Sequence, residues 1–182
     1  MLQINIPFCT DGWTAGQHVR LGVFFEGRLF ESHPLSIMTA PPSVSCLTQV
    51  YPPGITLSAR VTGDWSRALN QFARNGPVVF SESSKASFDD DGLPRPVLVS
   101  IDGPYGGCSL DLGRYETVLL MAGGAGVTFT LGMLDDILGR CVRLGRRSNE
   151  KTRRIEFVWC MKSFGELVEF CFFSLIRGRV YV

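Results

Sequence analysis

Residues 115–128 read YETVLLMAGGAGVT and contain the strongest structural signal in the chain. Their first part, 115–122, is an apolar run typical of a central strand in a parallel sheet. The glycines that follow turn the chain into a predicted helix over 129–144, and a second apolar strand is predicted at 155–161 after a basic, polar loop, 146–154. Strand, glycine loop, helix and strand in this order form the first unit of a doubly wound nucleotide-binding fold.

The glycine loop has the chemistry of a phosphate site. Gly123, Gly124 and Gly126 let the backbone approach a pyrophosphate, and the amide groups of the following helix start favour negative charge. Thr128 can cap this helix or donate its hydroxyl to phosphate. The string lacks the last glycine of the Rossmann GxGxxG fingerprint, and glycine turns after strands are common. The loop alone therefore leaves a phosphate site and a plain turn open.

Up to about residue 107 the chain follows a different pattern, with short β-like runs broken by turn residues. The runs are 18–25, 35–39, 56–61, 78–81 and 97–102. Their spacing predicts a small antiparallel barrel. In 65–74, by contrast, Trp65, Leu69 and Phe72 recur at helical spacing, which predicts one short helix that plugs the barrel. We therefore expect a barrel domain over 1–110 and an α/β lobe over 111–182.

Composition excludes several classes of function. Hydrophobic residues make up 45% of the 182 residues, charged residues 19%, and the net charge is +1. A partner held by bulk electrostatics, such as nucleic acid, is not expected. The six cysteines have no CxxC pair and no metal-ligand spacing, which favours reduced thiols in a cytosolic setting and no metal site. They are Cys9, Cys46, Cys108, Cys141, Cys160 and Cys171.

No segment is expected to span a membrane. The start of the chain lacks the basic and apolar regions of a signal peptide. Residues 117–134 carry no charge over roughly the length of a spanning helix, but the glycine loop in their middle would break one. The apolar run 170–176 is too short.

His33-Pro34-Leu35-Ser36 is the second motif of interest. Pro34 fixes its own φ and favours an extended His33, so the side chains of His33 and Ser36 are presented reproducibly at a strand start. No carboxylate or cysteine stands at a recognisable spacing from His33. From this chemistry alone, a structural histidine is favoured over a functional one.

Six short motifs together resemble the ferric-chelate reductase and NADPH oxidase family, and most of all its fungal metalloreductase branch. Each motif is unspecific, but their order from Trp13 to Lys162 is specific and covers most of the chain. They are the segments 13–19 (WTAGQHV), 33–36 (HPLS), 63–66 (GDWS), 102–106 (DGPYG), 123–128 (GGAGVT) and 158–162 (VWCMK). The resemblance implies a six-stranded, antiparallel, Greek-key barrel of the ferredoxin-reductase type, followed by a partial α/β nucleotide-binding lobe.

The resemblance also implies where FAD would bind. The strand with His33, Pro34, Leu35 and Ser36 would lie along the flavin and its ribityl-phosphate arm. Leu35 stands where the family usually has phenylalanine, which keeps apolar surface but loses an aromatic face. The turn with Gly63, Trp65 and Ser66 would hold the FAD pyrophosphate at a helix N-terminus. Ser66 can equally be a helix N-cap.

A second group of residues would handle the nicotinamide nucleotide. Asp102 and the residues after it end the barrel in the family and frame the approach of the nicotinamide, although a simple inter-domain turn explains them too. Lys162 stands where the family usually has an arginine, so the charge is kept and the planar fork is lost. The residues implied are Gly103, Pro104, Tyr105 and Gly106 for this frame, and Gly123, Gly124, Gly126, Thr128 and Lys162 for NADPH.

The implied function is electron transfer from NADPH through FAD to a membrane haem pair and on to ferric iron, without a catalytic acid or base. The haem would belong to a membrane domain outside this chain, and this portion would face the cytoplasm. We expect the chain to be a fragment, with a truncated first strand and without the later strands of the nucleotide lobe. A superoxide-generating NADPH oxidase module and a non-catalytic FAD-binding-like remnant are the alternatives.

Overall fold

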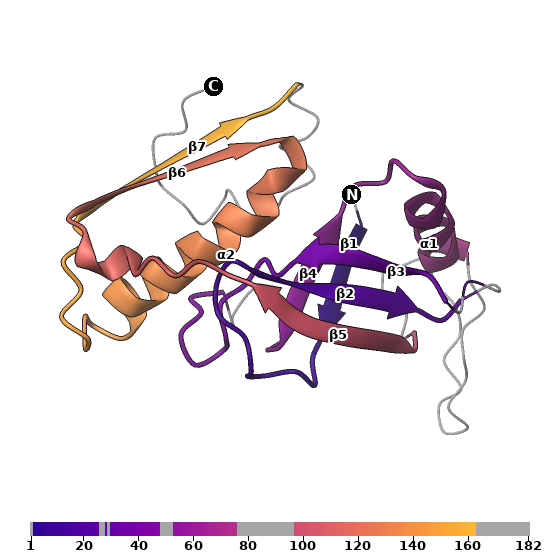
Figure 1. Ribbon diagram of the computed structural model, residues 1–182, viewed down its shortest axis with the longest axis horizontal. Coiled ribbons are helices and arrows are strands. Elements are labelled where there is room, and N and C mark those ends of the chain that lie inside the picture. The colour runs from indigo at the N-terminus through magenta and orange to yellow at the C-terminus, as the bar shows by residue number, and fades with distance from the viewer. Residues whose placement is uncertain (1, 26–27, 29, 48–52, 76–96, 163–182) are drawn as a thin grey trace, which may run out of the picture.

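The computed structural model has two parts that lie side by side (Figure 1). The structure describes residues 2–25, 28, 30–47, 53–75 and 97–162. The first part contains strands β1 (Leu2–Ile6), β2 (Gln17–Val23), β3 (Ser32–Ser36), β4 (Ile55–Ala59) and β5 (Val99–Gly106), with helix α1 (Asp64–Asn75). The second contains β6 (Thr117–Gly123), α2 (Val127–Leu138) and β7 (Arg154–Cys160), with short turns at Leu112–Arg114, Gly124–Gly126 and Gly139–Arg143.

The strands of the first part form two antiparallel sheets. One has the order β3-β2-β5 and the other pairs β1 with β4. A single bridge between Ile37 and Leu57 connects them. The described strands thus form no closed barrel, and the expected six-stranded Greek-key arrangement is not confirmed. The strand predicted at 78–81 lies outside the described residues.

Three strand boundaries differ from the sequence-based expectation. β1 was not predicted, although Leu2, Ile4 and Ile6 alternate with polar residues and five residue pairs join it to β4. β3 begins at Ser32 rather than at 35, because it is an edge strand, where Pro34 needs no backbone N–H. β5 continues through the expected turn to Gly106, with an irregular register opposite His18 and Arg20.

Helix α1 confirms the short helix predicted inside the barrel region. Trp65 and Leu69 are buried in the same apolar cluster as the inner residues of β2 and β4. Phe72 packs against this cluster, with its ring centroid 5.5 Å from that of Phe25. The helix therefore closes one side of the core between the two sheets.

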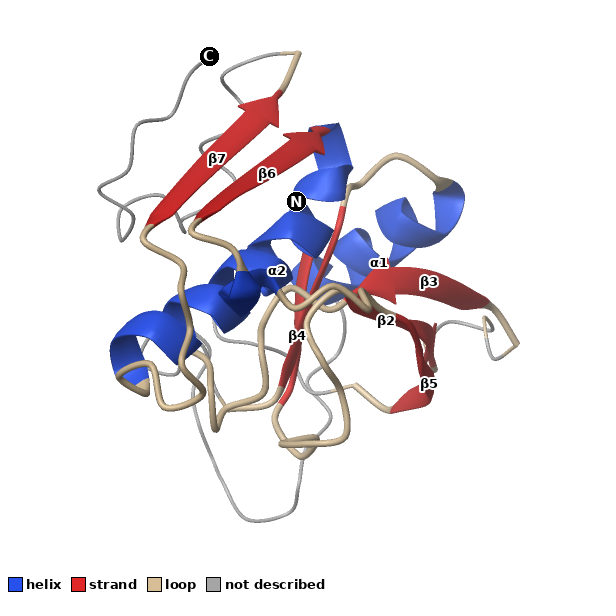
Figure 2. Cartoon of the chain, turned by 60° about the vertical axis from the view of Figure 1, so that its left-hand side comes forward, coloured by secondary structure: helices blue, strands red, loops and turns tan. Residues whose placement is uncertain are grey.

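The second part confirms the strand, glycine loop, helix and strand predicted from the sequence. β6 and β7 are parallel over seven residue pairs, from Thr117 with Arg154 to Gly123 with Cys160. α2 lies between this pair of strands and the antiparallel sheets (Figure 2). It starts two residues earlier than predicted and changes after Leu138 into a π-turn. No helix among the described residues has the length and apolarity needed to cross a bilayer.

The two parts are joined by contacts from α2 and the turn after it to the backbone of residues 37–46. Both carboxylate oxygens of Asp135 accept hydrogen bonds, from the N–H of Ala40 at 2.8 Å and of Cys46 at 2.9 Å. Gly132 lies so close that a Cβ there would be 2.7 Å from the carbonyl oxygen of Ile37. Arg143 donates to the carbonyl of Ser45 at 2.7 Å. α2 is therefore fixed against the chain that directly follows β3.

Candidate functional site

His33 and Trp65 form an aromatic pair that joins β3 to α1. Their ring centroids are 4.1 Å apart, with an angle of 32° between the ring planes. The His33 Nε2 and Trp65 Nε1 atoms are buried, and neither has a hydrogen-bond partner in the described structure. The nearest carboxylate oxygen to His33 Nε2, on Glu31, is 3.7 Å away and too far for a hydrogen bond.

Such unpaired buried nitrogens are uncommon in folded proteins, and each calls for an explanation. A polar cofactor that lies against the pair would provide partners for both atoms. Exposure does not explain the missing partner of Trp65, which is only 6% exposed, and the Nε2 atom of His33 is buried although 38% of its side chain is exposed. The pair therefore fits a polar group of the kind that FAD would present. Nothing in the local sequence pattern predicts this contact, which joins residues 32 positions apart.

The alternation of β3 separates the members of the His33–Ser36 motif. His33 and Leu35 are paired with Leu21 and Val19, which are buried in the core. Pro34 and Ser36 alternate with them and so point to the opposite face of the sheet. The two halves of the motif therefore line different sides of β3.

On that opposite face, His18 lies between two of the predicted site residues. It is paired with Ser36 of β3 on one side and with Tyr105 of β5 on the other. The ring centroids of His18 and Tyr105 are 5.9 Å apart. Sequence reasoning did not include His18 among the site residues, and only the strand register reveals its position.

The 102–106 segment forms the end of β5 rather than a free turn. The Tyr105 hydroxyl donates to Asp102 Oδ1 at 2.5 Å, and this hydrogen bond raises the pKa of Tyr105. Gly103 and Gly106 have φ of 133° and 65°, and the bond from Gly103 to Pro104 is cis. Gly106 is close to His18, since a Cβ there would be 3.3 Å from its Nδ1.

The Ser66 hydroxyl is used within its own turn. It accepts the N–H of Thr62 and of Gly63, both at 3.0 Å, and donates to the Gly63 carbonyl at 3.0 Å. Ser66 is the third residue of α1, so it is not the N-cap. A serine hydroxyl has one donor and two acceptor sites, and all three are used here. Ser66 therefore shapes the turn at Gly63, and any pyrophosphate contact of its hydroxyl would require this turn to change.

The glycine loop lies at the carboxyl ends of β6 and β7. A Cβ added at Gly123, Gly124 or Gly126 would meet no atom within 4 Å, so the fold itself does not need glycine for space there. Gly124 has φ of 49°, and its carbonyl accepts the Trp159 indole N–H at 3.0 Å. The open space beside the loop fits the approach of a phosphate group at a helix start.

Two further predicted residues flank this loop. Thr128 is buried and donates its hydroxyl to the Ala125 carbonyl at 3.1 Å, so its proton supports the loop. Lys162 is exposed two residues after Cys160, the last residue of β7. Both stand at the same end of the sheet as the loop, which is the end where doubly wound folds bind ligands.

The class of fold follows from this architecture of antiparallel sheets and a β–α–β unit. A solved ferredoxin reductase in carbazole 1,9a-dioxygenase matches 96% of this chain and 42% of its own, with a TM-score of 0.53 and 12% identity. At that identity the likeness shows the fold alone. The chain thus has a ferredoxin-reductase-like fold.

The family follows from sequence comparison. An FAD-binding domain family model matches residues 1–109, and the model of the ferric reductase NAD binding domain matches residues 115–171. The chain belongs to the ferric reductase and NADPH oxidase family of flavoproteins, as the motifs predicted. It is an oxidoreductase module with domains for FAD and NAD(P)H.

Two relatives illustrate the range of this family. Respiratory burst oxidase homolog protein D of Arabidopsis thaliana is 31% identical over 159 residues, covering 75% of this chain and 15% of the relative. Ferric reduction oxidase 8, mitochondrial, of the same plant is 23% identical over 138 residues, covering 76% and 16%. The chain thus spans about a sixth of the length of the curated relatives it matches.

Proposed function

We propose that this chain is the FAD- and NADPH-handling part of a membrane enzyme that reduces ferric iron through haem. The observation that supports it most is the His33 and Trp65 pair, whose buried ring nitrogens lack partners within the described protein. The family model of the second domain, described as a ferric reductase NAD binding domain, supports the same activity.

In this proposal the chain binds and orients, and it moves no proton. FAD, when bound, supplies the conversion of one hydride into two single electrons. In this arrangement, His33 of β3 and Trp65 of α1 contact the flavin with their ring nitrogens. Pro34 and Ser36 lie on the opposite face of β3. Leu35 packs towards Val19 in the core, so its aliphatic side chain supports the strand.

The nucleotide is held by the glycine loop in the proposed arrangement. The loop backbone and the start of α2 favour a pyrophosphate, and the exposed Lys162 adds a positive charge at the same end of the sheet. A lysine attracts phosphate as a point charge without the bidentate fork of arginine. We therefore propose that the chain prefers NADPH to NADH, and that this preference is weaker than it would be with an arginine at position 162.

The electron acceptor is the second part of the proposal. We place a haem-bearing membrane domain outside this chain, with the described portion on the cytoplasmic side. Ferric iron is preferred because of the family model's description and the ferric reduction oxidase relative. The respiratory burst oxidase relative favours a superoxide-generating oxidase as the second candidate.

A titration of FAD into the purified chain tests the flavin site. Flavin fluorescence and the visible absorbance of the flavin are followed in the wild type, His33→Ala and Trp65→Phe, which keeps an aromatic ring but removes the indole N–H. Gln71→Ala is the matched control, because Gln71 is exposed on the same helix. We expect a loss of about tenfold in affinity for each site variant, as for one hydrogen bond to a buried partner.

NADPH added without oxygen then tests the reaction, since it should bleach the bound flavin. Saturable binding of FAD without any bleaching would leave the non-catalytic module as the better description. A folded chain that binds no FAD would refute the proposal. In membranes that contain the longer protein, reduction of a ferric chelate without superoxide separates a ferric reductase from an oxidase.

A further inference from the structure

A basic pocket lies at the amino ends of β6 and β7. It has a volume of about 350 Å³ and is lined by Glu116, Arg146, Glu150, Lys151 and Arg153. Each strand is seven residues long, so the pocket is about 20 Å from the glycine loop at the carboxyl ends. It is therefore separate from the nucleotide site proposed above.

Main-chain hydrogen bonds hold the walls of this basic pocket in place. The N–H of Arg153 donates to the Glu116 carbonyl at 2.8 Å, and the N–H of Lys151 donates to the Gly113 carbonyl at 2.7 Å. Between them, the buried Thr152 hydroxyl lies 3.0 and 2.8 Å from the carbonyl oxygens of Leu112 and Tyr115. The side chains of Lys151 and Arg153 thus extend from a backbone that is anchored on both sides of Thr152.

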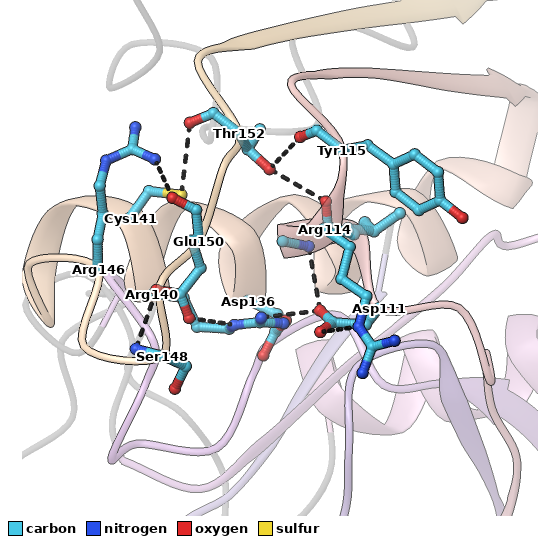
Figure 3. A network of polar contacts seen from close by, with 12 residues as sticks. Asp111, Arg114, Tyr115, Asp136, Arg140, Cys141, Arg146, Ser148, Glu150 and Thr152 are labelled. Atoms are coloured by element: carbon cyan, nitrogen blue, oxygen red, sulfur yellow. Dashed lines mark hydrogen bonds and ion pairs between the residues drawn. The ribbon is translucent and has the colours of Figure 1, made fainter.

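The Glu150 carboxylate does not face the pocket as a free anion (Figure 3). One of its oxygens accepts from Arg140 Nε at 3.1 Å and the other from the N–H of Ser148 at 3.2 Å. Its side chain is only 2% exposed. Arg146 meets the backbone of this residue instead, donating to the Glu150 carbonyl at 2.9 Å.

The remaining charge of the pocket is positive. Arg146, Lys151 and Arg153 face a single further carboxylate, that of Glu116. Neither Lys151 nor Arg153 forms an ion pair with a carboxylate of the described chain. Residues 146–154 carry five basic side chains and one acidic one, although the whole chain has a net charge of only +1. The positive charge is thus concentrated at this end of the sheet.

We propose that this basic pocket binds a small ligand with two or more phosphate groups. Guanidinium groups match the geometry of phosphate oxygens, and the pocket contains two of them beside a lysine. Its volume is at the lower end of the range for small-molecule sites, which fits one compact headgroup better than an extended acidic peptide. The ligand is either a soluble phosphorylated compound or the headgroup of a phosphoinositide in a membrane.

Binding of two probes to the 182-residue chain tests the proposal. Inositol 1,4,5-trisphosphate represents a soluble ligand, and phosphatidylcholine vesicles with and without phosphatidylinositol 4,5-bisphosphate represent a membrane. The double variant Lys151→Gln/Arg153→Gln removes two charges from exposed side chains and leaves the anchoring backbone intact. Arg147→Gln is the matched control, because Arg147 is exposed in the same loop but does not line the pocket.

We expect the double variant to weaken binding of the trisphosphate by about thirtyfold and the control to change it less than threefold, with unchanged circular dichroism for both. Vesicle binding that exceeds binding of the soluble probe would identify the lipid as the source. Equal losses in Arg147→Gln would overturn the pocket, as would unchanged binding in the double variant. Tighter binding of a poly-glutamate peptide than of the trisphosphate would also overturn it.

Discussion

Replacing Asp135 by alanine tests whether α2 holds the two parts of the molecule together. The Asp135 side chain is buried, and its two oxygens are the acceptors for the N–H groups of Ala40 and Cys46. Without them, two backbone donors would lose their partners, at a cost of about 1–3 kcal/mol each. Burial raises the pKa of Asp135, so the carboxylate itself carries a desolvation cost that the substitution removes.

The net loss expected in the free energy of unfolding is about 2–4 kcal/mol, once this relief is subtracted from the two lost hydrogen bonds. In a chain of this size, each kcal/mol lowers the melting temperature by about 2–4 °C, so we expect a decrease of roughly 5–15 °C. Thermal unfolding followed by circular dichroism measures it.

Asp136→Ala is the matched control on the same helix. Asp136 contacts Arg140 at 3.5 Å, and Arg140 keeps its shorter contacts with Asp111 and Glu150 when Asp136 is removed. We therefore expect a loss below about 1 kcal/mol, as for a weak ion pair. Equal destabilisation by the two substitutions, or a loss below 1 kcal/mol in Asp135→Ala, would refute the reasoning about the backbone contacts.

Three further substitutions test other parts of the structure. Arg140→Met should lower stability at neutral pH by about 2–4 kcal/mol. A hydrogen bond from Arg140 holds the pKa of Asp111 below the usual 3.8; burial opposes the lowering of the Glu150 pKa, but a backbone hydrogen bond and then Arg140 hold it below 4.5. The contribution of Arg140 is therefore complete above pH 4.5 and is lost as the pH falls further, so urea unfolding at several pH values should show the gap between variant and wild type narrowing there. Gly139→Ala should destabilise by about 1–3 kcal/mol in the same assay, because a Cβ would lie 2.0 Å from a carbonyl oxygen of the loop beside α2; an unchanged midpoint would contradict this close approach. Gly126→Ala should leave the melting temperature within about 2 °C of the wild-type value, since the added Cβ would meet open space. The same substitution should slow the reduction of bound flavin by NADPH several-fold. Unimpaired reduction would argue against the loop as the phosphate site.

Local patterns were sufficient to predict the second part of the fold and helix α1. The apolar run before Gly123, the glycines and the apolar run before Lys162 each act over a few residues, and the structure places β6, α2 and β7 close to the predicted positions. The same holds for Trp65 and Leu69, whose helical spacing is enough to define the buried face of α1.

Strand limits and cross-chain contacts could not be predicted in this way. Pro34 reads as the start of a strand until its place at a sheet edge is known. Gly103 and Gly106 read as a turn until β5 is seen to continue to Gly106, which is paired with Gln17 of β2. The position of His18 between two predicted site residues depends on the register of three strands. Register is set by tertiary packing, which a single sequence does not display.

The cysteines illustrate the same limit. The five that lie among the described residues are free thiols, and Cys171 lies outside them. Burial raises the pKa of the Cys46 and Cys141 thiols, which disfavours the reactive thiolate. For Cys46, the negative charge of Asp135, 89 residues away in sequence, adds to the effect of burial on the pKa.

At the contact between the α2 region and residues 37–46, the two segments contribute different kinds of hydrogen-bonding groups. Asp135 of α2 and Arg143 of the turn after it contribute side chains, whereas the loop contributes chiefly main-chain N–H and carbonyl groups. Every amino acid except proline carries both of these groups. Most substitutions in the loop would therefore keep the hydrogen bonds between the two parts, whereas substitutions of Asp135 or Arg143 would remove them. Relatives of this chain should accordingly vary more in the loop than at these two positions.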